Sequence, residues 1–168
     1  MINTLSRMIR TGILTEPSPA PAATSPAVEG LQKALRNILG RALCIRHVDA
    51  GSCNGCELEI QALNNPYYNL EGYGIKFVAS PRHADLLLVT GPVSVNMEEA
   101  LKRTLDAVPD PKLVVAVGDC GACGGVFGTS YASRGAVANV IPVHRTVTGC
   151  PPSPVAMLEA IRSAVLEA

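Results

Sequence analysis

The feature that most constrains the fold is a series of short aliphatic runs separated by stretches with helical spacing. The runs are rich in Val, Ile and Leu, and they cover residues 42–48, 74–79, 84–89 and 113–117, with a further short run at 140–143. Such runs are typical of strands that are buried on both faces of a parallel sheet. Residues 97–108 and 153–166 instead place apolar side chains on one helical face. Strands that alternate with helices predict an α/β domain, a doubly wound parallel sheet with flanking helices.

The first 28 residues differ from the rest and are predicted to precede this domain. Residues 1–14 form a short basic amphipathic segment, which could dock on a membrane-embedded partner or the membrane surface, or form a frayed terminus without a role. Residues 16–27 are a Pro/Ala-rich spacer that cannot bury a core. Residues 30–40 have helical spacing and end at a glycine. We therefore expect an N-terminal segment and linker over 1–28 and the α/β domain over 29–168.

Composition narrows the class of protein. Charged residues make up only 17% of the chain, which suggests burial against partners, although an aliphatic core with a small polar rim explains it equally well. The formal net charge is zero, which gives no support to nucleic-acid binding. No run approaches the ~18 apolar residues that cross a bilayer, so we expect the chain to stay on the cytoplasmic side. In a reducing cytosol, the six cysteines are better explained as metal ligands or buried thiols than as disulfides.

Four cysteines lie far apart in the sequence, yet each occupies a Gly- or Pro-flanked loop beside an apolar run. They are Cys53, Cys56, Cys120 and Cys150. Functional groups gather at the carboxyl ends of parallel strands, so three of the predicted loops could converge on one point. A Cys-x-x-Cys pair gives two thiolates to one metal or cluster, and neighbouring glycines let backbone amides approach the cluster sulfurs. The pattern indicates one buried iron-sulfur cluster with four thiolate ligands.

Other uses of the cysteines stay open at this point. Cys123 forms a second Cys-x-x-Cys with Cys120, and the two pairs together could bind a structural zinc ion. That site would leave Cys150 unexplained. A redox pair of the thioredoxin type is less favoured, because neither pair is predicted to open a helix after a strand. Cys44 lies inside a strand-like run and is predicted to be a buried, inert thiol.

The chain resembles the small electron-transfer subunit that is shared by nickel-iron hydrogenases and respiratory complex I, where it is called the 20 kDa or B subunit. The resemblance covers residues 46–160 and rests on four segments in the same order, RHVDAGSCNGCELEI, SPRHADLLLVTGPV, VAVGDCGACGGVF and TGCPPSP. It implies a flavodoxin-like fold. It also implies that Cys53, Cys56, Cys120 and Cys150 ligate one 4Fe-4S cluster, and Cys123 stands where the family has a small residue that is not a ligand.

Two details of the resemblance favour one branch of the family. Complex I members typically have two adjacent cysteines in the first motif, whereas hydrogenase members have the Cys-x-x-Cys of Cys53 and Cys56. The chain also ends soon after TGCPPSP, without the extension that carries two further clusters in uptake hydrogenases. The resemblance therefore points to membrane-bound, energy-converting hydrogenases, including formate hydrogenlyase-type complexes. The Pro-rich residues 16–27 have no counterpart in it.

This resemblance implies an oxidoreductase subunit that has no activity alone. Its cluster would lie next to the active site of a large hydrogenase-like, or complex I 49 kDa-like, subunit. Further partners would be a ferredoxin-like polyferredoxin subunit and membrane-embedded subunits, which would place the chain peripherally on the cytoplasmic face of the inner membrane. The alternative is the B subunit of a complex I-like NADH:quinone oxidoreductase that passes electrons to quinone. A structural zinc protein is the third possibility.

Four polar residues near these motifs each allow two interpretations. Glu57 could face the partner and pass protons, or be a solvated carboxylate in the first turn of a helix. Asp119 could cap its own loop or tune the cluster potential. Arg82 and His83 could supply cations near the cluster or partner, or be an exposed loop pair.

Overall fold

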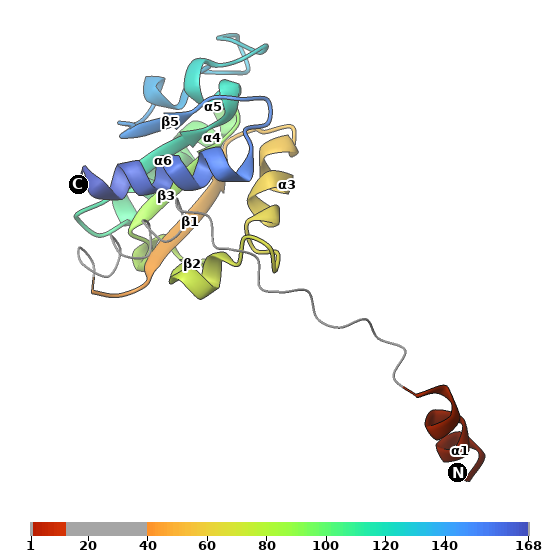
Figure 1. Cartoon of the computed structure of the whole chain (residues 1–168). Coiled ribbons are helices and arrows are strands. Elements are labelled where there is room, and N and C mark those ends of the chain that lie inside the picture. Colours follow the sequence, from red (N-terminus) through yellow and green to blue (C-terminus); the bar gives the residue numbers. More distant parts are fainter. Residues whose placement is uncertain (1, 13–39, 168) are drawn as a thin grey trace.

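The computed structural model describes residues 2–12 and 40–167. The N-terminal part is one helix, α1 (Ile2–Thr11), and the remainder is an α/β domain (Figure 1). The helix predicted over 30–40, except its last residue, and the boundary predicted between residues 28 and 29 lie outside the described residues.

Five parallel strands form one sheet in the order β2-β1-β3-β4-β5. The strands are β1 (Leu43–Asp49), β2 (Ile75–Phe77), β3 (Leu86–Thr90), β4 (Leu113–Val117) and β5 (Arg145–Val147). This is the strand order of flavodoxin-like folds, so the prediction of a doubly wound, flavodoxin-like sheet is confirmed. Every residue of β3 and β4 is buried, which explains why both strands are continuous aliphatic runs in the sequence.

Helices cover both faces of the sheet (Figure 1). On one face, α3 (Gly55–Ala62) and α6 (Pro154–Leu166) pack over a core that includes Leu88 and Val115. On the other face, α4 (Val95–Ala107) packs over Leu87 and Val114. The shorter helices are η1 (Leu70–Tyr73), η2 (Pro81–His83), α5 (Gly118–Cys123) and η3 (Val137–Asn139).

Two local predictions were wrong. Residues 140–143 are not a strand, because the Ile141 amide bonds to the carbonyl of Val137 in a turn and Pro142 has no amide hydrogen for a ladder. The fifth strand follows at Arg145–Val147. The glycine-rich segment after β4 was expected to be a loop, but its first six residues form α5. Within the described residues, none of the helices has the length and the apolar character that spanning a membrane requires.

Candidate metal centre

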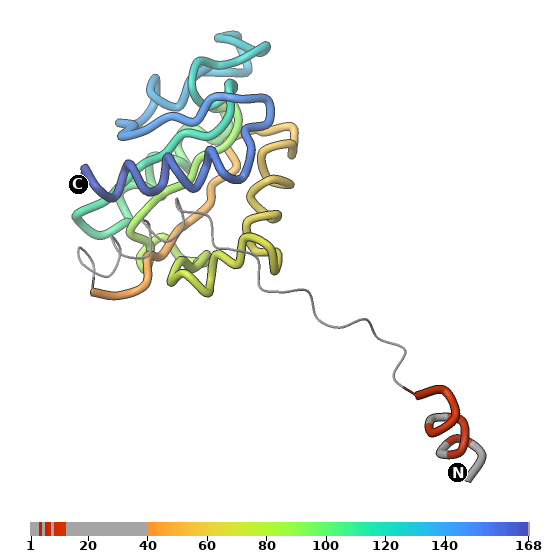
Figure 2. The backbone as a smooth tube through the Cα atoms, viewed as in Figure 1, coloured from red at the N-terminus to blue at the C-terminus, as the bar shows by residue number. Residues whose placement is uncertain are grey.

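The segments that follow β1, β4 and β5 lie at the carboxyl edge of the sheet (Figure 2). These three segments, called the cysteine loops, carry the predicted ligands. Cys53 lies between β1 and α3, and Cys56 is the second residue of α3. Cys120 lies in α5, directly after β4, and Cys150 lies between β5 and α6. The parallel strands therefore place four sequence-distant cysteines at one edge, as the strand pattern predicted.

Asp119 ties two of these loops together. Its carboxylate Oδ1 accepts a hydrogen bond of 2.7 Å from the Gly149 amide, and its own amide donates one of 3.0 Å to the Gly149 carbonyl. Asp119 and Gly149 are the immediate neighbours of Cys120 and Cys150. This reciprocal pair fixes the two cysteine backbones relative to each other, so Asp119 joins two loops rather than capping its own.

Glycines bring the backbone against the thiols. A Cβ atom built on Gly118 would lie 2.7 Å from Cys56 Sγ, and one on Gly125 would lie 2.9 Å from Cys120 Sγ. Both glycines also have positive φ, at 81° and 53°, which L side chains rarely adopt. Any larger residue at these two positions would collide with sulfur, so the glycines are required for the packing around Cys56 and Cys120.

The first and last cysteine loops also lie side by side. A Cβ atom on Gly55 would meet Cys53 Sγ at 3.6 Å and Pro151 Cβ at 4.0 Å. The segment after β1 therefore lies close to the segment after β5, which the Asp119 bond joins to the segment after β4.

The thiols influence one another electrostatically. Burial, followed by the charges of Glu57, Cys120, Cys53 and Cys150, raises the pKa of the Cys56 thiol to about 11. Burial, followed by the charges of Cys150, Cys53, Asp119 and Cys123, raises the pKa of Cys120. Each predicted ligand therefore lies within electrostatic range of Cys56 or Cys120, and these two thiols favour the protonated form in the metal-free chain.

Cys123 occupies a different position from the four predicted ligands. Its side chain is exposed and its thiol donates a hydrogen bond of 3.2 Å to the Asp119 carbonyl, one turn back on α5. Its charge acts on Cys120, whereas that of Cys150 acts on both Cys120 and Cys56. Cys150 therefore lies within electrostatic range of both Cys56 and Cys120.

Four soft thiol donors suit either an iron-sulfur cluster or zinc by their chemistry. Within residues 2–12 and 40–167, no three His, Cys, Asp or Glu side chains gather closely enough to hold a single metal ion together. The expectation that neither cysteine pair opens a helix was wrong for Cys53 and Cys56, since α3 begins between them. Cys120 and Cys123 are the third and the last residue of α5. Unlike an isolated redox pair, however, Cys120 has Cys53 and Cys150 beside it.

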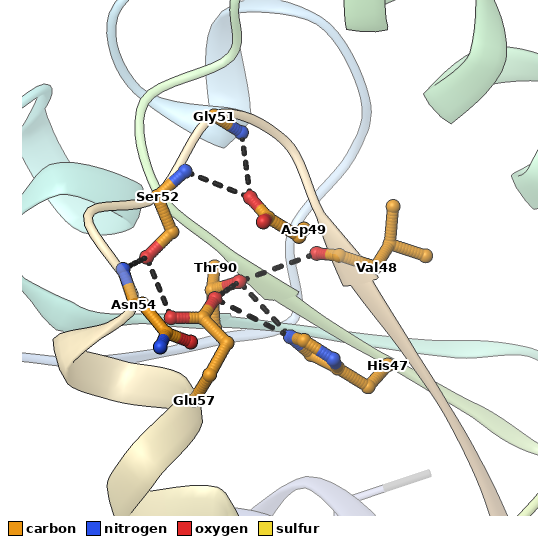
Figure 3. Close-up of polar contacts among 8 residues, drawn as sticks. All are labelled: His47, Val48, Asp49, Gly51, Ser52, Asn54, Glu57 and Thr90. Atoms are coloured by element: carbon orange, nitrogen blue, oxygen red, sulfur yellow. Dashed lines mark hydrogen bonds and ion pairs between the residues drawn. The ribbon is translucent and has the colours of Figure 1, made fainter.

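A buried carboxylate, Glu57, follows Cys56 in α3. Glu57 is only 8% exposed, so the solvated reading was wrong. Its Oε2 accepts a hydrogen bond of 2.7 Å from the Ser52 hydroxyl, and its Oε1 accepts one from Thr90 Oγ1 (Figure 3). His47 Nε2 lies 3.0 Å from Thr90 Oγ1 and 3.6 Å from Glu57 Oε1. Burial lowers the pKa of His47, against the opposing charges of Glu57 and Asp49.

The loop that carries Cys53 is held from two sides. Asp49 Oδ1 accepts hydrogen bonds from the amides of Gly51 (2.8 Å) and Ser52 (2.7 Å) at the end of β1 (Figure 3). Gly91, just after β3, approaches so closely that a Cβ atom there would lie 2.4 Å from the Ser52 amide nitrogen. The turn before Cys53 is therefore set by the ends of both β1 and β3.

Sequence reasoning missed the roles of His47, Ser52 and Thr90. One signal was available for Thr90, which is the single polar residue at the end of the otherwise aliphatic run LLLVT. Arg82 and His83 are exposed in η2, which precedes β3. They therefore lie at the amino edge of the sheet. The hypothesis that they lie near the cluster was wrong for both residues.

Comparison with known proteins gives a consistent set of relatives. The chain is 46% identical over 127 residues to the probable membrane-bound hydrogenase subunit mbhJ of Pyrococcus furiosus, covering 76% of each chain. It is 39% identical over 140 residues to formate hydrogenlyase subunit 7 of Escherichia coli, covering 83% of this chain and 55% of that relative. A chain in the structure of the membrane-bound sulfane sulfur reductase, an archaeal respiratory membrane complex, matches with a TM-score of 0.66 and 32% identity over 82% of this chain and 75% of that chain.

These relatives are subunits of oxidoreductase complexes, which agrees with the family expected from the motifs. A family model described as NADH ubiquinone oxidoreductase, 20 Kd subunit, matches residues 53–164. The matched range begins at Cys53 and contains the four predicted ligands. The chain belongs to the family of the 20 Kd subunit of NADH ubiquinone oxidoreductase.

Proposed function

We propose that the chain is the electron-transfer subunit of a membrane-associated, nickel-iron hydrogenase-type complex and that Cys53, Cys56, Cys120 and Cys150 hold one 4Fe-4S cluster. The observation that carries this proposal is the meeting of the three cysteine loops at the carboxyl edge of the sheet, where Asp119 and Gly149 bond to each other. We assign the cluster to the α/β domain, residues 29–168.

The proximity of the thiols supports this assignment. Metal ligands must be thiolates, and in the metal-free chain burial and neighbouring charge raise the pKa of Cys56 and Cys120. Cationic iron would replace the protons and relieve the repulsion between neighbouring thiolates, so cluster binding and thiol deprotonation are coupled. When bound, a 4Fe-4S cluster supplies one-electron chemistry at a potential that hydrogen bonds and burial adjust.

The chain's own residues would orient and shield this group. Gly118 and Gly125 let the backbone lie against the two more buried sulfurs, and the Glu57 carboxylate, next in sequence to Cys56, is fixed by Ser52 and Thr90. Cys53 and Cys150 are exposed, whereas Cys56 is buried. One side of the centre therefore faces the surface, where the large subunit with the active site would dock.

The relatives indicate the kind of complex. Both the membrane-bound hydrogenase subunit and the formate hydrogenlyase subunit support a hydrogenase-type assembly, in which electrons pass between the large subunit and a ferredoxin-like subunit. Membrane-embedded subunits would hold the assembly, with this chain peripheral on the cytoplasmic face of the inner membrane. The alternative of a quinone-reducing complex I-like B subunit is not favoured by these relatives.

The test compares two single variants of the anaerobically purified full chain. The wild-type chain should contain about four irons with matching sulfide and give a paramagnetic signal on reduction. C150S should lose the iron and the signal, whereas C123S should keep both. Stoichiometric zinc without iron would refute the cluster, and iron loss in C123S with retention in C150S would refute this ligand set.

A further inference from the structure

The N-terminal helix α1 is not used by the proposed electron transfer. The family match begins at Cys53, so α1 (Ile2–Thr11) lies well outside it. Among the described residues, α1 shares no ion pair or side-chain hydrogen bond with residues 40–167, and it lies apart from the sheet (Figure 1). A role for α1 must therefore come from its own surface.

The sequence of α1 has two distinct sides. On a helix with 3.6 residues per turn, positions 2, 5, 8 and 9 share an arc of roughly 120°, and all four are Ile, Leu or Met. The arginines at 7 and 10 fall on the opposite side. Ile9 is 77% exposed, and both arginines are exposed as well. Ile9 on the apolar side and both arginines on the cationic side are thus accessible.

The charged side chains at the N-terminus are all positive. Residues 1–15 contain two arginines and no Asp or Glu, so the cations have no acidic partner within α1. The whole chain has a formal net charge of zero, so attraction to an anionic surface would be local to α1 rather than a property of the whole protein. Paired apolar and cationic sides are the pattern of helices that lie in the interface of an anionic membrane.

Length and stability favour a helix that lies on a surface. A helix of 10 residues is about 15 Å long, half of what is needed to cross the hydrocarbon core of a bilayer. Isolated helices this short are marginal in water, so a surface that covers the apolar side would stabilise α1. A bilayer interface can cover that side and neutralise the arginines at the same time.

We propose that α1 is a lipid-binding helix that lies parallel to the membrane on anionic phospholipid headgroups. Its apolar side would enter the headgroup boundary, and Arg7 and Arg10 would contact lipid phosphates. This goes beyond the proposed function, because it needs neither the cluster nor a partner subunit. It gives the chain a contact with the bilayer of its own.

The test is cosedimentation of the full chain with vesicles. We expect binding to vesicles of phosphatidylcholine mixed with phosphatidylglycerol, weak binding to phosphatidylcholine alone, and loss of binding as salt is raised. Each basic residue near an anionic surface contributes an attraction that corresponds to about fivefold in partition. R7Q/R10Q should therefore bind roughly thirtyfold more weakly, and I9N should also bind more weakly.

The matched control is K76Q/R103Q, which removes the same charge from exposed positions on the α/β domain and should bind like the wild-type chain. Equal binding of the wild-type chain to neutral and anionic vesicles, or unchanged binding of R7Q/R10Q, would overturn the proposal. In that case the remaining occupant is the protein surface of a membrane-embedded subunit. The iron content of each variant, measured on the same samples, separates this outcome from failure of the cluster assignment.

Discussion

The two ends of the parallel sheet use similar residues for different purposes. At the amino end, Asp85 accepts hydrogen bonds from Arg41 and from the Cys44 amide, and so joins the start of β1 to the residue before β3. At the carboxyl end, Asp119 joins the loops after β4 and β5. Both carboxylates connect neighbouring segments. Only at the carboxyl end do the connected segments also carry thiols that lie near one another.

The end of the sheet at which a residue lies therefore identifies a candidate site better than the residue type does. An apolar cavity of about 550 Å³ opens at the amino end, lined in part by Cys44, Arg82 and His83, yet the other five cysteines lie in the carboxyl-end loops. The prediction that Cys44 is buried was wrong, because its side chain is half-buried beside this cavity. Matched residues at the two ends of the sheet therefore differ in their expected effects.

The largest difference should come from the cysteines. C53S removes a proposed ligand from a cluster that depends on four thiolates. The iron content should therefore fall from about four irons per chain to near zero. C44S changes the same atom at the amino end and should leave the iron content unchanged. Iron and sulfide analysis after anaerobic purification makes the comparison. Equal iron in both variants would mean that Cys53 is not a ligand.

The next difference should come from two glycines with nearly the same φ. Gly118 has φ 81° and Gly74, just before β2, has φ 82°, so alanine at either position costs about 1 kcal/mol or more for the backbone alone. A Cβ on Gly74 meets nothing within 4 Å, whereas one on Gly118 would collide with Cys56 Sγ. We expect G118A to lower the unfolding free energy by about 2–4 kcal/mol and G74A by about 1 kcal/mol.

Urea unfolding of the two glycine variants measures this difference. G118A should also retain less iron than G74A, since the collision displaces a proposed ligand. If both variants unfold at the same urea concentration, the backbone at Gly118 has room for a side chain, and the tight packing around Cys56 is not required.

The two aspartates should separate stability from cluster retention. A hydrogen bond to a charged acceptor contributes about 1.5–3 kcal/mol, so D119A and D85A should destabilise the chain by similar amounts. Only D119A releases the Cys120 loop from the Cys150 loop, so only D119A should speed the loss of iron to a chelator. Chelator kinetics and urea unfolding on the same samples test this. Equal rates of iron loss would show that the Asp119 bond is structural and no more.

The sequence predicted the sheet and the placement of the four cysteines well, because both follow from short-range patterns. Continuous aliphatic runs such as LVVAV have few alternatives to a buried parallel strand, and the carboxyl-end rule then collects the loops that follow. The sequence did not predict the contacts between residues that come together only in the folded chain. The Asp119 bond to Gly149 and the Thr90 bond to Glu57 join residues 30 and 33 positions apart, and no local spacing records them. The short helix α5 was also missed, because three of its six residues are Gly or Asp, which are weak helix formers.

The smallest difference should appear as a pH dependence. Burial lowers the pKa of His47, so below about pH 6.5 the unfolded chain takes up a proton that the folded chain still excludes. The unfolding free energy should therefore fall as the pH drops from about 6.5 towards the lowered pKa of His47 in the folded chain, and this contribution should level off below that pKa. H47Q removes it and should flatten the slope in this window, whereas H83Q, at an exposed position before β3, should keep the wild-type slope. Urea unfolding at a series of pH values compares the three chains, and the carboxylates that titrate at lower pH are common to all of them. An unchanged slope in H47Q would mean that Glu57 and Asp49 offset the burial of His47, so the carboxyl end would then respond to pH no differently from the amino end.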